Sequence, residues 1–131
     1  MDFAYNDEQK EIIKVVRDLV EKEIVPYASE MDETGKLHEG LLEKLAAQGL
    51  LGVAIPEEFG GAGLDAITIA AIYEELGKGC AGVATTVAAN ALASYPVIIA
   101  GNDDQKKRYF DIINEDNLAA FALTEPGTGS D

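Results

Sequence analysis

The residues best placed to do chemistry lie at the end of the sequence, in segment 124–131, where two glycines and a proline stand among hydroxyl side chains. Pro126 fixes one backbone φ angle, and Gly127 and Gly129 permit tight or left-handed turns. Three hydroxyl side chains accompany them: Thr124, Thr128 and Ser130. Successive backbone N–H groups in such a turn can form an anion-binding nest. The segment suits a phosphate or the polar edge of a ring, although on physical grounds alone a turn without a ligand has equal weight.

The glycine pattern differs from the two common phosphate-binding motifs. No lysine follows the glycines, as a P-loop requires, and the spacing is not the G-x-G-x-x-G of dinucleotide-binding domains.

The other reactive side chains are better explained as structural residues. One His and one Cys allow neither a Ser-His-Asp triad nor a zinc site of the usual kind, so we expect no metal. His38 begins a helix in a polar stretch, and Cys80 lies among small residues, which favours a surface role and a buried role respectively. Glu74 and Glu75 are neighbours on a predicted helix and do not face each other, so they are not an acid/base pair.

The composition limits the classes of partner. The chain has 131 residues, 24 acidic and 10 basic, for a net charge of −14. Such a chain does not hold nucleic acid by counterion release, and an anionic membrane surface is equally disfavoured. The first residues carry neither a signal peptide nor an Arg-rich transit peptide, so we expect a cytoplasmic protein, or a mitochondrial matrix protein if a presequence has been removed.

Helical periodicity dominates the sequence and predicts an all-α fold, an orthogonal or up-down bundle of about six helices. Apolar residues recur at helical spacing in successive stretches: 7–25, about 27–33, 38–48, 66–78, the uncharged run 79–102, and 103–113. The uncharged run is long enough to span a bilayer, but its small residues insert poorly, so we expect the buried centre of the bundle and no membrane span. Pro96 is expected to break it into two pieces.

The pattern changes after residue 117. Segment 118–123 is a short, continuous apolar run that predicts a buried strand leading into the glycine-rich turn. A single strand has no partner for its backbone groups, so we expect it to pair outside these residues. The predicted organisation is a helical domain, 1–117, and the first strand and loop of a β domain, 118–131.

Segment 121–131, FALTEPGTGSD, resembles the flavin-binding signature of the acyl-CoA dehydrogenase family over nearly its whole length. Four further segments resemble landmarks of that family in the same order: 3–9, 55–61, 73–77 and 100–107. The resemblance covers essentially the whole chain and is nearest to the medium-chain type.

The resemblance implies roles for particular residues. Phe121, Leu123 and Thr124 match positions at the flavin ring of FAD, and Gly129 and Ser130 match positions at its diphosphate. Ser130 also matches a contact to the bound acyl-CoA. On the uncharged helix, one face matches the lining of the acyl-chain pocket: Ala84, Thr85, Ala88 and Leu92. Small residues there leave room for a medium or longer acyl group, although close helix packing explains them as well.

The resemblance also implies an activity. Family members are longer homotetrameric FAD enzymes that oxidise an acyl-CoA to the trans-2-enoyl-CoA by α-proton abstraction and β-hydride transfer, usually passing electrons to electron-transfer flavoprotein. Their catalytic carboxylate has no counterpart here, so we expect residues 1–131 alone to be inactive and to bind FAD weakly or not at all. The alternatives are an oxidase or reductase of the same superfamily, and a non-catalytic split or partner-binding helical module.

Overall fold

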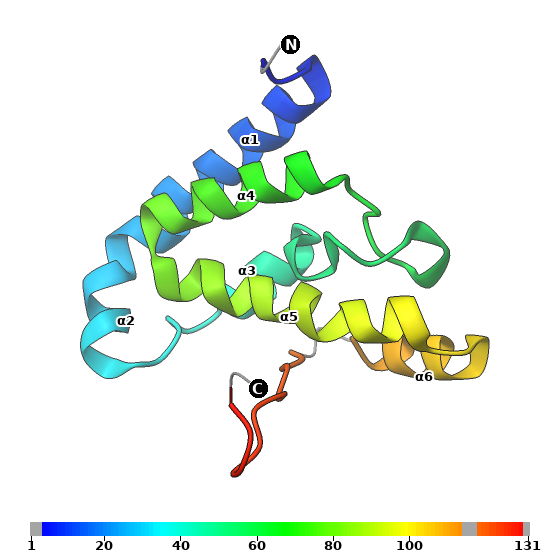
Figure 1. Ribbon diagram of the computed structural model, residues 1–131. Helices are drawn as coiled ribbons and strands as arrows, with labels where there is room; N and C mark the ends of the chain where they lie inside the picture. The colour runs from blue at the N-terminus through cyan, green and yellow to red at the C-terminus, as the bar shows by residue number, and fades with distance from the viewer. Residues whose placement is uncertain (1–3, 114–117, 130–131) are drawn as a thin grey trace.

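The computed structural model describes residues 4–113 and 118–129, and every regular element among them is helical (Figure 1). The described α-helices are α1 (Asp7–Leu19), α2 (Ala28–Thr34), α3 (Leu41–Ala47), α4 (Ala66–Gly79), α5 (Ala81–Ala100) and α6 (Asp103–Ile113). A π-helical turn, Val20–Ile24, and three 3₁₀ turns, Val25–Tyr27, Leu50–Gly52 and Glu57–Phe59, connect them. The all-α class predicted from the sequence is confirmed.

The helices form a small bundle built around the pair α4 and α5. These two helices run antiparallel from a tight turn at Cys80, and α1 lies along α4 (Figure 1). The 3₁₀ turn Leu50–Gly52 contacts both α3 and α5, and α6 packs beside the far end of α5. The long helix α5 therefore contacts most of the bundle.

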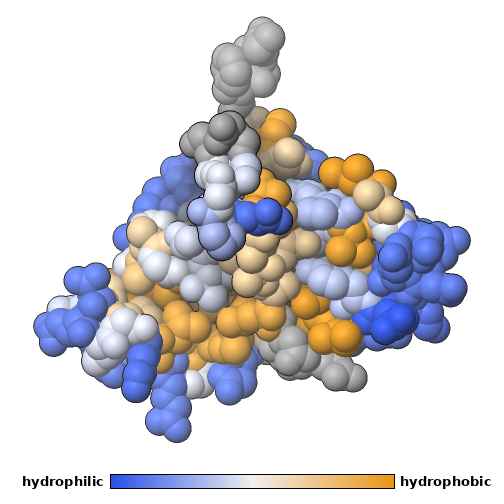
Figure 2. All heavy atoms as spheres, turned by 60° about the horizontal axis from the view of Figure 1, so that its bottom comes forward, coloured by the Kyte–Doolittle hydropathy of each residue, from blue (hydrophilic) through white to orange (hydrophobic). Residues whose placement is uncertain are grey.

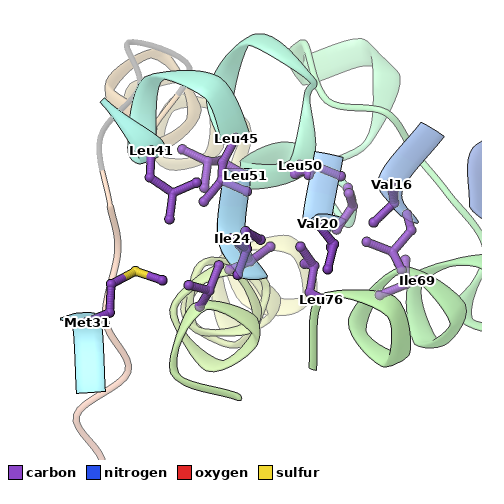
Figure 3. Close-up of a cluster of buried hydrophobic side chains, with 14 residues drawn as sticks. Val16, Val20, Ile24, Met31, Leu41, Leu45, Leu50, Leu51, Ile69 and Leu76 are labelled. Atoms are coloured by element: carbon purple, nitrogen blue, oxygen red, sulfur yellow. The ribbon is translucent and has the colours of Figure 1, made fainter. Parts of the chain in front are cut away.

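The core lies where these elements meet. Figure 3 shows Val16 and Val20 directed toward Ile69 and Leu76 of α4, with side chains of α3 beyond them. Val20, Leu45 and Leu76 are buried almost completely. Each fully buried aliphatic side chain of this size stabilises the fold by about 2 kcal/mol before entropy is counted, so this cluster holds α1, α3 and α4 together.

Side-chain caps start α1, α4 and α6, whereas α2, α3 and α5 begin without one. Asn6 and Gln9 form a reciprocal capping box at α1, with N···O distances of 2.8 and 3.1 Å. Asp65 accepts the N–H groups of residues 67 and 68 at the start of α4, and a hydrogen bond from the Thr68 hydroxyl lowers the pKa of the Asp65 carboxyl. The same box recurs before α6, between Asn102 and Gln105.

A buried ion pair fastens α1 to α4. The Arg17 guanidinium donates to both oxygens of Glu75 at 2.9 and 3.0 Å, and Lys78 donates to the same carboxylate at 2.7 Å. The Glu75 side chain is only 7% exposed, and the hydrogen bond from Arg17 lowers its pKa to about 2. The Glu75 carboxylate is therefore engaged in holding α1 against α4.

The end of α4 approaches the π-helical turn unusually closely. A Cβ atom on Gly79 would lie 2.5 Å from Cγ1 of Val20 and 3.1 Å from Cγ2 of Ile24. The side chains of Val20 and Ile24 occupy the space that any larger residue at 79 would need, so glycine is required by packing at this position.

The prediction that Pro96 breaks the uncharged run is wrong, because α5 continues through it from Ala81 to Ala100. Pro96 lies on the exposed side of α5, where the carbonyl of Leu92, which lacks its usual helical donor, can reach water. The helix is also not the buried centre of the bundle, since only one of its faces is covered. By length and composition α5 could cross a membrane, a test that core helices of soluble proteins also pass.

Two further expectations need correction. Residues 118–124 form no strand and are mostly exposed, because no neighbouring strand within the described residues offers hydrogen bonds. The spacing of Phe110, Ile112 and Ile113 in segment 103–113 predicts that all three face inward, but Ile112 is exposed on the outer side of α6.

Candidate functional site

The glycine-rich turn is a closed hairpin tip on the surface. The N–H and carbonyl groups of Glu125 and Thr128 bond to each other at 3.1 Å in both directions. This exchange occupies two N–H groups that an anion nest would use, and neither Gly127 nor Gly129 has a positive φ angle. In this conformation the turn exposes hydroxyl groups but forms no anion-binding nest.

The residues before the tip expose apolar and polar groups side by side. Phe121 is 42% exposed and Leu123 is 72% exposed, and Thr124 is also exposed. Exposed apolar groups of this size beside a hydroxyl suit a flat, partly polar ligand. Gly129 closes the described segment, and Ser130 lies outside the described residues.

The segment is tied to the bundle by one buried amide. The Ala119 N–H donates to Oδ1 of Asn90 on α5, with an N···O distance of 2.6 Å. Nδ2 of the same side chain donates to the Leu51 carbonyl at 3.3 Å. Ala119 also packs against the small cluster of Ile55, Phe110 and Ile113, so a bond and a hydrophobic contact together fix where the segment begins.

Of the four α5 residues expected to contact a substrate, Thr85, Ala88 and Leu92 lie toward the exposed side of that helix, whereas Ala84 lies at its edge, packed against the core cluster. Ala84 and Ala88 are half-buried, Thr85 is exposed, and Leu92 is 51% exposed. The Thr85 hydroxyl donates to the Ala81 carbonyl at 2.8 Å, so its proton is used within the helix. Residues 79–102 include no charged residue other than Lys78 just before them and Asp103 just after, so this side of α5 is an uncharged, largely apolar surface.

The apolar surface continues toward the end of α5 through Tyr95 and Ile99, both exposed. Figure 2 shows hydrophobic side chains gathered on the face of the molecule turned forward there, with hydrophilic groups at its sides. Contiguous exposed apolar side chains are typical of surfaces that bind a partner or a ligand.

Within the described residues, the two predicted sets are linked only indirectly. Within residues 4–113 and 118–129, no hydrogen bond joins Phe121, Leu123 or Thr124 to the α5 positions 84, 85, 88 and 92. Helix α5 connects the two sets, because Asn90 on its buried side binds Ala119 at the start of the segment that carries Phe121, Leu123 and Thr124.

Tyr73 is a buried hydroxyl at the seam of α4 and α5. Its oxygen has no hydrogen-bond partner among the described residues, and burial, with a smaller contribution from Tyr95, raises the pKa of Tyr73 to about 12. The phenol therefore stays protonated under all physiological conditions.

A separate apolar cavity of about 360 Å³ lies between α1, α4 and segment 48–64. Val15, Leu19 and Leu64 are among its lining residues, and none of the residues predicted to bind cofactor or substrate lines it. No pattern in the sequence indicates this cavity, because its walls come from segments far apart in the chain.

Asn90 was also missed. Its signal in the sequence is an amide within an otherwise apolar, uncharged helix, where a polar side chain must find buried partners. His38, expected on the surface, is half-buried with its ring stacked on Tyr27 at a centroid distance of 3.5 Å. Cys80, expected to be buried, is a half-buried free thiol at the α4–α5 turn. No group of three metal-ligating side chains gathers in the described part of the chain.

Comparison with known proteins gives one family. The family model described as "Acyl-CoA dehydrogenase, N-terminal domain" matches residues 6–114. A 3-(aryl)acrylate reductase from Clostridium sporogenes is 41% identical over 128 residues, which are 95% of this chain and 34% of the relative. A probable mitochondrial medium-chain specific acyl-CoA dehydrogenase from Caenorhabditis briggsae is 36% identical over 132 residues, covering 100% of this chain and 32% of that protein.

Solved structures show the same fold. A chain of the structure described as "Electron transferring flavoprotein of Acidaminococcus fermentans: Towards a mechanism of flavin-based electron bifurcation" matches with a TM-score of 0.89 and 32% identity, over 99% of this chain and 35% of that one. The acyl-CoA dehydrogenase of Bacillus anthracis complexed with FAD matches with a TM-score of 0.83 and 37% identity, over 97% of this chain and 22% of that one.

Proposed function

The chain belongs to the acyl-CoA dehydrogenase family, and we propose that it is the helical N-terminal domain and first flavin-contacting segment of an FAD-dependent enzyme that oxidises an acyl-CoA. It spans about a third of the length of the relatives it matches. The observation that carries the proposal is that the family match over 6–114 is followed directly by the signature segment 121–131. The proposed boundary between the domains is 117/118.

The described residues of the signature segment fit one edge of FAD. Phe121 and Leu123 expose apolar groups to a ring, and the Thr124 hydroxyl is exposed for a hydrogen bond to its polar edge. Gly129 and Ser130 are proposed to meet the diphosphate. The bound flavin would accept the hydride, and the task of these residues is to hold and orient it.

The exposed side of α5 is proposed to line the acyl pocket, through Ala84, Thr85, Ala88 and Leu92. Its lack of charge and its exposed apolar area support this role, because an acyl chain gains free energy from leaving water without needing a polar partner. Ser130 is proposed to contact the acyl-CoA as well. The small side chains at 84 and 88 favour a medium or longer acyl group.

The reaction is proposed to be α-proton abstraction with β-hydride transfer to flavin, giving the trans-2-enoyl-CoA. No carboxylate of this chain is assigned as the base: Glu75 is bound by Arg17 and Lys78, and we place the base in the part of the protein beyond these residues. Residues 1–131 alone are therefore expected to be inactive.

Electron-transfer flavoprotein is the proposed electron acceptor, and the similarity to a chain in an electron-transferring flavoprotein structure supports it. A homotetramer is proposed for the full-length protein, in the cytoplasm, or in the mitochondrial matrix if a presequence is removed. The similarity to the reductase from Clostridium sporogenes makes a reductase the second candidate. An oxidase of the same superfamily and a non-catalytic partner-binding module are weaker candidates, because no specific observation favours either.

The test is to purify the full-length protein and titrate it anaerobically with saturated acyl-CoAs of increasing chain length. We expect a yellow protein with stoichiometric FAD whose visible absorbance bleaches, most readily with chains of medium or greater length. Bleaching that peaks at four carbons would contradict the assignment of the α5 pocket. Reduction of an arylacrylyl or enoyl substrate without bleaching by saturated acyl-CoA would favour the reductase, and a colourless protein would leave the partner-binding module.

A further inference from the structure

We propose that Asn90 is the residue that positions the flavin segment on the helical domain, by tying its start to the buried side of α5. The flavin assignment rests on the proposed function, whereas the tie itself rests on hydrogen bonds, burial and position.

The Asn90 side chain is matched to its two partners. It is 1% exposed, its Oδ1 accepts the Ala119 N–H at 2.6 Å, and its Nδ2 donates to the Leu51 carbonyl at 3.3 Å. An asparagine amide supplies an acceptor and a donor at a fixed separation, which a carboxylate or an aliphatic side chain of the same size does not. Because both partners are backbone groups away from water, losing either bond leaves an unsatisfied buried group.

Neighbouring groups hold Asn90 itself in place. The hydroxyl of the fully buried Ser94 donates to the Asn90 carbonyl at 2.7 Å and lies 3.4 Å from the Tyr109 hydroxyl of α6. A buried polar network whose members are all paired favours a single geometry. These bonds fix the stretch of α5 from which the Asn90 side chain reaches Ala119 and Leu51.

The position of the tie determines what it can control. Phe121 comes two residues after Ala119, and Thr124 comes five residues after it. At about 3.5 Å per residue, Phe121 therefore lies within roughly 7 Å of Ala119, and Thr124 within roughly 18 Å. On α5, Asn90 stands between Ala88 and Leu92 but on the opposite side of the helix. The same helix thus carries the proposed acyl-binding surface on one side and the attachment point of the flavin segment on the other. It thereby sets the position of a bound flavin ring relative to a bound acyl group.

The first test is amide hydrogen exchange on the full-length protein. In the wild type, the Ala119 amide is expected to exchange far more slowly than those of Ala120 and Phe121. In Asn90→Leu this protection is expected to disappear, whereas Val87→Ala, a cavity in the same buried side of α5, is expected to keep it. A fast Ala119 amide in the wild type, or retained protection in Asn90→Leu, would overturn the tie without reference to any cofactor.

The second test concerns the flavin. We expect Asn90→Leu to weaken FAD binding about tenfold or more and to shift the visible flavin spectrum. Val87→Ala, compared at a similar loss of thermal stability, is expected to keep the FAD affinity and spectrum of the wild type. If Asn90→Leu does not fold, Asn90→Asp replaces it, since Asp keeps an acceptor for Ala119 but sets an oxygen against the Leu51 carbonyl. Equal FAD affinity and spectra in the Asn90 and Val87 variants would overturn the positioning role. A wild type that binds no FAD would instead refute the proposed function, and the exchange test would still decide the tie.

Discussion

At the scale of single residues, Glu75 shows how one carboxylate can be devoted to architecture. Its bonds to Arg17 and Lys78 lower its pKa to about 2, so its stabilising effect is complete above the ordinary carboxyl pKa and is lost as the pH falls toward 2. We expect Glu75→Gln to reduce the free energy of unfolding by about 2 kcal/mol near neutral pH. This deficit should shrink between about pH 5 and pH 2.5, as urea unfolding at several pH values would reveal.

Glu74→Gln is the matched control, because Glu74 is exposed and pairs only with Lys78 among the described residues. It should change stability by less than about 0.5 kcal/mol at any pH. A Glu75→Gln deficit that stays constant down to about pH 2.5 would show that the carboxylate does not titrate with folding.

Two glycines of α4 differ in what surrounds them. A methyl group on Gly79 would meet Val20 and Ile24, while one on Gly77 would lie 4.0 Å from the Ala84 methyl, an ordinary contact. We expect Gly79→Ala to destabilise the fold by about 1 to 3 kcal/mol and Gly77→Ala to stabilise it by up to about 1 kcal/mol. Thermal unfolding of the two variants in parallel decides this, and equal shifts of the midpoint would contradict the close approach of the π-helical turn.

At the scale of elements, the sequence predicts what local patterns determine. Several features can be predicted directly from the sequence because each acts within one turn of helix. They are the apolar periodicity, the caps at Asn6 and Asp65, and the glycines Gly35 and Gly49 at helix ends. The predicted third helix, 38–48, begins later in the structure, at Leu41 after the left-handed Gly40.

The errors fall where the outcome depends on distant neighbours. Whether Pro96 breaks a helix depends on which side of α5 it occupies, and whether 118–123 forms a strand depends on a partner strand. Likewise, the tie from Asn90 to Ala119 joins residues 29 positions apart. The candidate site could be predicted as residue types on a face and a turn, but not the buried amide that connects them.

The continuity of α5 leads to a prediction about Pro96. Replacement by Ala would restore the N–H that the Leu92 carbonyl lacks, in a helix that already runs through this position. We expect Pro96→Ala to raise the free energy of unfolding by about 1 to 2 kcal/mol, after allowance for the greater freedom of the unfolded chain. Urea unfolding measures this, and a loss of stability would mean that the ring itself is needed in the packing.

At the scale of the whole molecule, a net charge of −14 and an uncovered apolar surface oppose each other. The charge keeps copies of residues 1–131 apart, but salt screens it over about 10 Å at 0.1 M and less at higher concentration, while apolar association persists. We therefore expect the isolated chain to be monomeric at low salt and to self-associate as salt is raised, as seen by sedimentation velocity.

The variant Ile99→Lys separates the two effects, because it lowers the net negative charge and yet removes the most exposed large apolar side chain of α5. If the α5 surface drives association, Ile99→Lys should abolish it at high salt despite the weaker repulsion. Val25→Lys makes the same charge change at an exposed apolar residue outside α5, and should associate as strongly as the wild type or more. Association of Ile99→Lys as strong as that of Val25→Lys would mean that the contact between copies lies outside the α5 surface.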